Sequence, residues 1–190
     1  MRLIWITTLL LISCSGQRET TKQEDAKLGY FKNTFLKKFK ILQLPCDIGE
    51  GKGVASKNLP TTDPKTLDSL FTQSTSVTLL CYGMLSDTAR FYTLVFYAPA
   101  VTYVPVLVTF DKNGSKIHDR SVDFGCWDGG PDNYECDGHL TVDKNLNLNF
   151  EHVTTCYGCD STSTAPKLYI DKGKGKIGKD GQIKLNIIRN

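Results

Sequence analysis

Cysteines are the residues of this 190-residue chain with the most direct chemistry, and the sequence contains seven of them. Cys14 lies in an apolar N-terminal segment. The other six are spread along the chain: Cys46, Cys81, Cys126, Cys136, Cys156 and Cys159. Such thiols can form structural disulfides, exchange with other disulfides, or bind zinc as thiolates. The choice among these depends on which elements bring the sulfur atoms together.

Strand signals dominate the sequence from residue 76 onward, where apolar residues recur at every second position. We expect strands over residues 77–84, 89–98, 102–110, 116–124, 136–143, 146–153, 165–170 and 182–188. Turn-forming residues such as Lys112-Asn113-Gly114 and Lys144-Asn145 separate most of them, and such direct connections indicate an antiparallel meander. The predicted fold class is therefore mainly β, with a meander of about eight strands that forms a bent sheet, a sandwich or a barrel. Pro105 cannot donate to a strand ladder, so we expect it at an edge or a bulge, which favours an open sheet.

One or two short helices are expected before these strands. Phe31, Phe35 and Phe39 recur at every fourth residue among lysines, which is the period of an amphipathic helix that packs its phenylalanines on the domain. Asp63-Pro64 has the residue types that begin a helix, so a second short helix is expected up to about Gln73.

The meander predicts where four of the cysteines lie. Alternate turns of a meander fall at opposite ends of the sheet, and the turns at 112–114 and 144–145 share one end. Cys126 follows the fourth expected strand, Cys136 begins the fifth, and Cys156 and Cys159 follow the sixth. We therefore expect these four cysteines together at the opposite end.

Three chemistries are open to this cysteine cluster. Structural disulfides would pair Cys126 with Cys136, Cys156 with Cys159 and Cys46 with Cys81, with crossed pairing between the first two pairs as the rival arrangement. Thiol–disulfide exchange by Cys156-Tyr157-Gly158-Cys159 is the second, although the following residues are poor helix formers and cannot supply a helix dipole. The third is a zinc site, with His139 or His152 as further ligands.

The loop between Cys126 and Cys136 is rich in acidic and aromatic residues. Its carboxylates, together with Asp137, could bind calcium with low affinity, although the spacing is not that of an EF-hand. Its best candidates for contacting a partner or a glycan are Trp127, Asp128, Asp132 and Tyr134. We interpret it as a binding loop.

Motifs for catalysis and for cofactors are not found in the sequence. His118, His139 and His152 lie in or beside expected strands without a nucleophile motif, and no phosphate-binding or dinucleotide-binding pattern occurs. The net charge of +3 argues against a dedicated nucleic-acid binder. Lysines at positions 172, 174, 176 and 179 alternate with glycines, which indicates a solvated hairpin turn or, alternatively, a patch for anionic lipid or glycan.

The N-terminal segment has the layout of a secretory signal peptide: Arg2, an apolar run from Leu3 to Ile12, and the small residue Ser13 before Cys14. The run is about half of the roughly 20 residues that a membrane-spanning helix needs. We expect residues 1–13 to be removed, residues 14–27 to form a flexible polar tether, and residues 28–190 to form one β-rich domain.

Leu11-Ile12-Ser13-Cys14 resembles the lipobox of bacterial lipoproteins. Together with the polar tether, Phe35-Leu36-Lys37-Lys38-Phe39, Leu44-Pro45 and the turn from Thr109 to Gly114, it makes the chain resemble small uncharacterised envelope lipoproteins of the Bacteroidota. The resemblance implies cleavage before Cys14 and attachment of acyl chains such as palmitate to its sulfur. Ser15 and Gly16 lack the aspartate that retains some lipoproteins at the inner membrane, so the resemblance favours the outer membrane.

Taken together, these features predict a non-enzymatic envelope lipoprotein that acts as a binding or assembly module without a cofactor. The expected partners are the membrane, through the lipid on Cys14, and an envelope protein or a glycan. The alternatives are a thiol–disulfide oxidoreductase that uses Cys156 and Cys159, and a β-barrel that binds a small apolar ligand.

Overall fold

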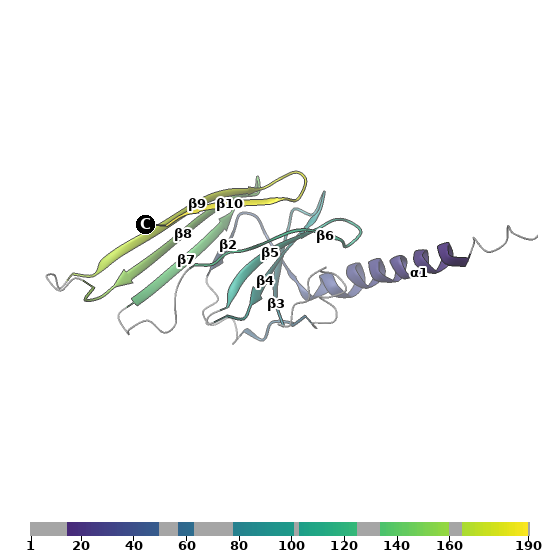
Figure 1. Cartoon of the computed structure of the whole chain (residues 1–190), viewed down its shortest axis with the longest axis horizontal. Coiled ribbons are helices and arrows are strands. Elements are labelled where there is room, and N and C mark those ends of the chain that lie inside the picture. The colour runs from purple at the N-terminus through teal and green to yellow at the C-terminus, as the bar shows by residue number, and fades with distance from the viewer. Residues whose placement is uncertain are drawn as a thin grey trace, which may run out of the picture. The chain divides into compact units, whose positions relative to one another are not determined.

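The computed structural model describes residues 15–49, 57–62, 78–100, 103–124, 134–159 and 165–189 (Figure 1). The chain divides into two compact units, Met1–Lys37 and Lys38–Asn190. The expected helix over 63–73 lies outside the described residues.

The first unit is helical. An α-helix, α1 (Ser15–Tyr30), continues into a π-helical turn, η1 (Phe31–Phe35), and then into the 3₁₀ turn η2 (Leu36–Lys38) at the unit boundary. The prediction of a flexible tether over residues 15–27 therefore differs from the structure. Glutamine, glutamate, lysine, arginine and alanine all have good helix propensity, so a polar segment can be helical without an apolar face. Among the described residues, no helix has the length and apolar character needed to span a membrane.

The three regularly spaced phenylalanines do not lie on one continuous α-helix. The rings of Phe31 and Phe35, both buried, stack with centroids 5.8 Å apart in the wider π-helical turn of η1. Phe39 belongs to the second unit and packs edge-on against Phe96, with ring centroids 5.0 Å apart. Packing of Phe39 on the β-domain is therefore confirmed.

Ten described strands make up the second unit, and they form two five-stranded sheets. The strands are β1 (Lys40–Leu42), β2 (Cys46–Gly49), β3 (Leu80–Leu85), β4 (Tyr92–Ala98), β5 (Val104–Phe110), β6 (Lys116–Ser121), β7 (Tyr134–Val142), β8 (Asn147–Cys156), β9 (Lys167–Ile177) and β10 (Ile183–Ile188). All eight expected strands are present, whereas β1 and β2 were not predicted because three or four residues carry too little periodicity.

Each sheet is a four-stranded antiparallel meander with one short strand from the N-terminal side added at an edge. Sheet A has the order β1-β3-β4-β5-β6, and sheet B has the order β10-β9-β8-β7-β2. β1 runs parallel to β3, and the chain then crosses at the cis peptide Leu44–Pro45 to place β2 antiparallel to β7. Residues 40–49 therefore belong to both sheets.

The two sheets pack as layers around one core (Figure 1). Val95 and Leu107 from sheet A and Leu140 and Phe150 from sheet B are members of the same buried cluster. The mainly β meander is therefore confirmed in its sandwich form, since neither described sheet closes on itself.

Pro105 does not mark an edge or a bulge, so that prediction was wrong. β5 lies between β4 and β6, and the register shift on that side falls between Thr109 and Phe110. The Pro105 carbonyl accepts a hydrogen bond from Val122 N (2.9 Å), so the position where its N–H would be faces the end of β6. The pairing of β5 with β6 ends at Val106 and Ser121. The N–H that Pro105 lacks is therefore not needed for a hydrogen bond within the β5–β6 ladder.

Three hairpin turns at one end of the sandwich share the same geometry. They cover residues 111–115, 143–147 and 178–182, and in each the fourth residue donates to the carbonyl of the first while the first donates to the fifth. The fourth residue has a positive φ in every case: Gly114 (83°), Leu146 (60°) and Gly181 (81°). This is the three-residue hairpin loop with a bulge that fits the right-handed twist of the strands. We call this end of the second unit the turn end.

Aspartate side chains hold these turns through the backbone. The Asp111 carboxylate accepts from Asn113 N (2.9 Å) and Ser115 N (2.8 Å). The Asp143 carboxylate accepts from Asn145 N and Asn147 N, both at 2.8 Å. Both aspartates lie between an apolar residue and a lysine, in Phe110-Asp111-Lys112 and Val142-Asp143-Lys144, and this apolar-Asp-Lys step occurs three times in the chain. Its third occurrence, Ile170-Asp171-Lys172, lies inside β9.

Candidate functional site

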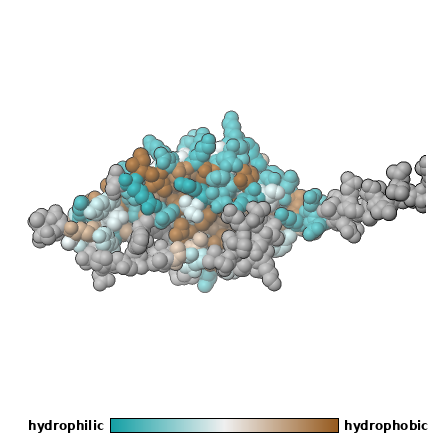
Figure 2. All heavy atoms as spheres, in the orientation of Figure 1, coloured by the Kyte–Doolittle hydropathy of each residue, from teal (hydrophilic) through white to brown (hydrophobic). Residues whose placement is uncertain are grey.

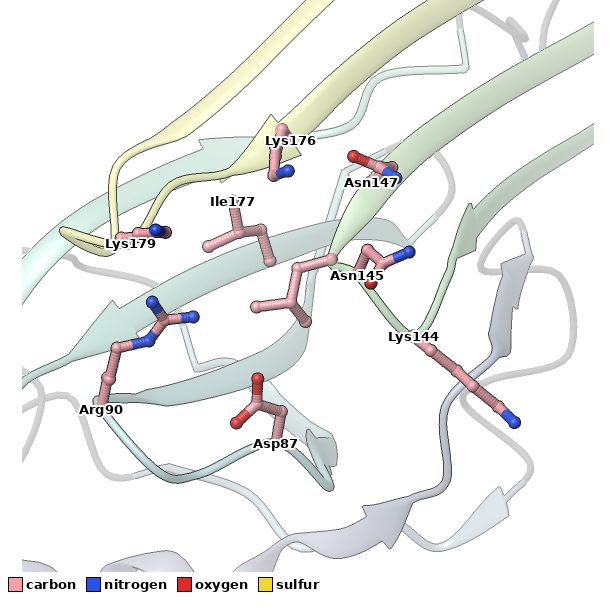
Figure 3. Close-up of a pocket in the computed structure, with 9 residues that line it drawn as sticks. Asp87, Arg90, Lys144, Asn145, Asn147, Lys176, Ile177 and Lys179 are labelled. Atoms are coloured by element: carbon pink, nitrogen blue, oxygen red, sulfur yellow. The ribbon is translucent and has the colours of Figure 1, made fainter.

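A cavity of about 360 Å³ opens at the turn end, between the ends of the two sheets (Figure 3). Sheet A contributes Asp87 and Arg90 from the β3–β4 connection. Sheet B contributes residues 144–147 from the β7–β8 turn, together with Lys176, Ile177 and Lys179 from the β9–β10 hairpin. We call this cavity the turn-end pocket.

The rim of the turn-end pocket is basic. Arg90, Lys144, Lys176 and Lys179 line it, against the single carboxylate of Asp87. None of these four cations forms an ion pair with a described residue. Figure 3 shows Arg90 and Asp87 projecting toward Ile177, while Lys144 points away from the other side chains.

Nearby carboxylates are committed to the turns themselves. Asp87 accepts a hydrogen bond from Ala89 N (3.2 Å), and Asp180 accepts one from Gln182 N (3.1 Å). Hydrogen bonds from the side chain and backbone of Asn147 are the main reason that the pKa of Asp143 lies below its ordinary value. These carboxylates accept hydrogen bonds from the backbone of their own turns, which leaves the rim cations to attract an anion.

The base of the pocket is apolar and hydrogen-bonded between two connections of sheet B. Leu146 and Ile177 are both buried in the main core, and Ile177 N donates to Leu146 O at 3.0 Å, which joins the β7–β8 turn to the end of β9. On the sheet A side, Ser86 N donates to Leu42 O at 2.9 Å. A cationic rim above an apolar base suits a ligand that carries an anionic group on a ring or chain.

A second hollow of about 430 Å³ adjoins the pocket and shares Lys176 and Lys179 with it. Its other lining residues are Gly178, Asp180, Gln182 and Lys184. The basic character of the rim therefore continues onto β10.

The opposite end of the unit, which we call the cysteine end, holds three of the predicted cysteines. Cys136 on β7 pairs in register with Thr154, and Cys156 at the end of β8 pairs with Tyr134. Cys156 and Cys159 are joined by a disulfide, and Cys136 is also disulfide-bonded. The placement opposite the hairpin turns is the one that the meander predicted. Cys14 and Cys126 lie outside the described residues.

The expected Cys46–Cys81 bridge is not formed, and both residues are free thiols. Cys46 packs against the core between the sheets, whereas Cys81 pairs with Phe96 on the other face of sheet A, so the two sulfur atoms are separated by a sheet. Burial, reinforced by the charge of Asp47, raises the pKa of Cys46 to about 11. Burial raises the pKa of Cys81 to about 12, although the nearby Lys38 acts in the opposite direction. Both thiols are therefore protonated and poorly nucleophilic at neutral pH.

The predicted binding loop is described only at its end. Trp127, Asp128 and Asp132 lie outside the described residues. Tyr134 begins β7 with 45% of its surface exposed, and its hydroxyl lies 3.4 Å from Cys159 Sγ. Since a disulfide sulfur carries no hydrogen, the Tyr134 hydroxyl is the donor. Tyr157 Oη donates to the Glu135 carboxylate at 2.8 Å beside it.

The histidines do not combine into a metal site with other described residues. His139 lies between two carboxylates, with Nδ1 3.0 Å from Asp47 and Nε2 3.0 Å from Asp137. His152 is buried, and its Nδ1 is 3.9 Å from Asp171. Over the described ranges, no group of three or more His, Cys, Asp and Glu side chains is arranged to hold a metal ion.

Sequence reasoning missed most of the turn-end pocket. Arg90 and Asp87 lie in a connection that looks like any polar turn. The lysines at 172, 174 and 176 were assigned to a turn, but they lie on β9, where Gly173 and Gly175 occupy the alternate positions. The available signal was this alternation itself, since a period of two is typical of a strand and places all three lysines on one face.

The fold and the pocket together define a β-sandwich with a basic pocket where its hairpin turns meet. Comparisons with family models, with curated protein sequences and with solved structures found no match for the chain.

Proposed function

We propose that this chain is a non-enzymatic binding module of an envelope lipoprotein and that it binds an anionic ligand in the turn-end pocket. The observation that carries the proposal is the set of rim cations, unpaired among the described residues, above an apolar base. A ligand carboxylate, sulfate or phosphate would supply the negative charge that the rim lacks.

The chemistry of the cysteines supports binding over catalysis. The two free thiols have pKa values raised to about 11 and about 12, and Cys156 and Cys159 are joined to each other. The loop with Trp127 and Asp132 remains a prediction as a second contact surface.

Isothermal titration calorimetry with digalacturonate tests the pocket. We expect millimolar to micromolar binding that weakens about tenfold or more in the double variant Arg90→Ala/Lys179→Ala, because each lost charge contact contributes about 1 kcal/mol or more. Lys144→Ala removes the same charge from the same rim, but its side chain points away, so its affinity should stay within about twofold of the parent. Equal effects of the two changes, or no binding to the parent, would overturn the proposal.

The proposed location depends on Cys14. Two or more acyl chains on this residue would hold the protein at a membrane almost permanently, at about 0.8 kcal/mol per buried methylene. Mass spectrometry of the full chain from its native host should find residues 1–13 removed and the sulfur acylated. An intact initial methionine with an unmodified thiol would refute the lipoprotein assignment without affecting the pocket.

A further inference from the structure

The solvent face of sheet B beside the turn-end pocket carries a regular array of amide and ammonium groups. Residues directly opposite each other in antiparallel strands lie on the same face. One row across the sheet is Asn147, Lys176 and Lys184, and the next is Asn149, Lys174 and Asn186. We call these six residues the Asn–Lys grid.

The grid is continuous with the pocket. Lys176 lines the turn-end pocket and the adjoining hollow, and Lys184 lines that hollow as well. Lys174 lies two residues before Lys176 on β9, about 7 Å away along the strand. A chain of cations therefore leads from Arg90 out of the pocket and across the sheet.

The basic surface ends one row further along. Lys172 Nζ lies 3.3 Å from the Glu151 carboxylate, so its charge is already balanced, and its neighbour on β10 is the exposed Ile188. Figure 2 shows hydrophilic atoms over β9 and β10 near their turn and hydrophobic atoms toward the C-terminal end of β10. The Asn–Lys grid therefore covers two rows of sheet B and ends at the row of Glu151, Lys172 and Ile188.

Glycines beneath the lysines keep the two rows in register. A Cβ atom on Gly173 would lie 2.9 Å from Asn186 O, and one on Gly175 would clash with Lys184 O. Only glycine allows β10 to approach β9 this closely while lysines occupy the other face. The K-G-K-G-K segment therefore presents three ammonium groups on one face of β9.

The side-chain types favour a sugar polymer. Asparagine amides both donate and accept, which matches the hydroxyl groups of sugars, and lysines match carboxylates or sulfates. Neither the grid nor the residues lining the two hollows include an aromatic side chain, so the base stacking used by single-strand nucleic-acid binders is not available there. The grid has no apolar members that could enter a lipid surface.

We propose that the Asn–Lys grid and the turn-end pocket form one binding surface for a linear acidic polysaccharide bearing carboxylate or sulfate groups. This inference rests on the proposed function and extends it from a single anionic group to a chain that runs across sheet B. Its carboxylate or sulfate groups contact the lysines, and its hydroxyl groups bond to the amides of Asn149 and Asn186, since the Asn147 amide already donates to Asp143 at 2.8 Å.

Chain-length dependence is the direct test. Binding of galacturonate di-, tetra- and octasaccharides to the full chain is measured by calorimetry at low and moderate salt. We expect affinity to rise about tenfold or more from the disaccharide to the octasaccharide, because additional sugar units engage additional sites on one surface. Uncharged amylose oligosaccharides of equal length should bind at least about tenfold more weakly.

A matched pair of variants locates the effect. Lys174→Ala/Asn149→Ala should weaken octasaccharide binding about fivefold to tenfold and leave disaccharide binding within about twofold. Lys172→Ala is the control on the same strand and face, and it should change neither, because Glu151 already neutralises that lysine. Unchanged circular dichroism and thermal unfolding establish that each variant is folded.

The outcomes separate the two proposals. Disaccharide binding that depends on Arg90, without tighter binding of longer chains, would overturn this inference and leave the proposed function standing. Absence of binding to every acidic sugar would overturn both. Single-stranded DNA that binds more tightly than the octasaccharide, or vesicles of phosphatidylglycerol that bind independently of the grid, would overturn the polysaccharide as the ligand.

Discussion

The turn end and the cysteine end of the sandwich are stabilised in different ways. At the turn end, backbone hydrogen bonds and aspartate caps fix three hairpins of one geometry, and the basic side chains remain unpaired with described residues. At the cysteine end, side chains stabilise the strands instead. They are the Cys156–Cys159 disulfide, the hydrogen bond from Tyr157 to Glu135, and the buried His152 near Asp171. Where the main chain supplies the stability, the side chains are available for a ligand.

The two ends also differ in what they expose. The turn end presents lysines and asparagines, whereas Leu168 on the cysteine-end part of β9 has 58% of its surface exposed and Glu135 and Asp137 lie across the same face on β7. A single sheet therefore changes from basic to acidic and apolar along its length. If the turn end serves binding and the cysteine end serves stability, a change at one end should alter only one of these two properties.

The largest expected effect on stability is that of replacing Phe124, which lies between the two ends. This buried ring stacks on Phe150 at 5.3 Å and covers Gly138, where a Cβ atom would lie 2.7 Å from Phe124 Cγ. Phe124→Ala should lower the free energy of unfolding by about 3–4 kcal/mol. Denaturant unfolding followed by tryptophan fluorescence and by circular dichroism should give coincident transitions, because both ends share one core. Separate transitions would show that the two ends are independent.

Removal of the Cys156–Cys159 bridge should destabilise one end without altering binding. The double variant Cys156→Ala/Cys159→Ala should lose about 2 kcal/mol, the entropy of a short closed loop, and should keep the digalacturonate affinity of the parent. Cys46→Ala serves as the control that removes a free thiol.

The same bridge distinguishes a structural role from thiol exchange. A structural disulfide should have a reduction potential below about −300 mV, measured by equilibration with dithiothreitol buffers. A potential near that of known oxidoreductases, with reduction of a model disulfide substrate, would favour the redox alternative.

A smaller effect is expected at the turns. Gly114 has φ of 83°, where a side chain is strained, so Gly114→Ala should lower stability by about 1 kcal/mol. Ser115→Ala on the next residue is the control. Because the turn at 111–115 does not line the pocket, ligand affinity should be retained.

The smallest effects are those of pH, and they have opposite signs at two sites. Burial acts to lower the pKa of His139, but hydrogen bonds and charges from Asp137 and Asp47 outweigh it and raise the pKa. The stability from this group is fully present below its ordinary pKa of about 6.5 and is lost as pH rises through the raised folded pKa. The lowered pKa of Asp143 gives stability that is present above its ordinary value of 3.8 and is lost as pH falls through the lower folded pKa. NMR titration of both residues, with unfolding measured in His139→Gln and Asp143→Asn, checks the two directions.

The sequence was sufficient for the strands and insufficient for their division into sheets. Alternation such as Leu146-Asn147-Leu148-Asn149-Phe150 records which face is buried, so all eight strands of the meander could be predicted. The break between β6 and β7 depends on which faces pack together, and period-two patterns are the same in one sheet or two. The prediction that Pro105 lies at an edge or a bulge failed for a similar reason, because the consequence of its missing N–H depends on where β6 ends.

The candidate site was hard to predict because it is assembled from three connections. Arg90 and Lys179 are 89 positions apart, and no local pattern joins them. The lysine–glycine alternation was visible, but its interpretation as a turn hid the face that it creates. Cysteines drew attention to the opposite end of the unit, where Cys156 and Cys159 are joined by a disulfide.

The segment that belongs to both sheets has a consequence for the order of folding. Asp47 on β2 and His139 on β7 are 92 residues apart, so β2 cannot pair with β7 until most of the chain has been synthesised. β2 is therefore the first strand of sheet B to be synthesised, but it has no partner until β7 has been made. Until then its backbone groups are unpaired, and a nascent chain halted before residue 139 has an open sheet edge that invites association with other chains.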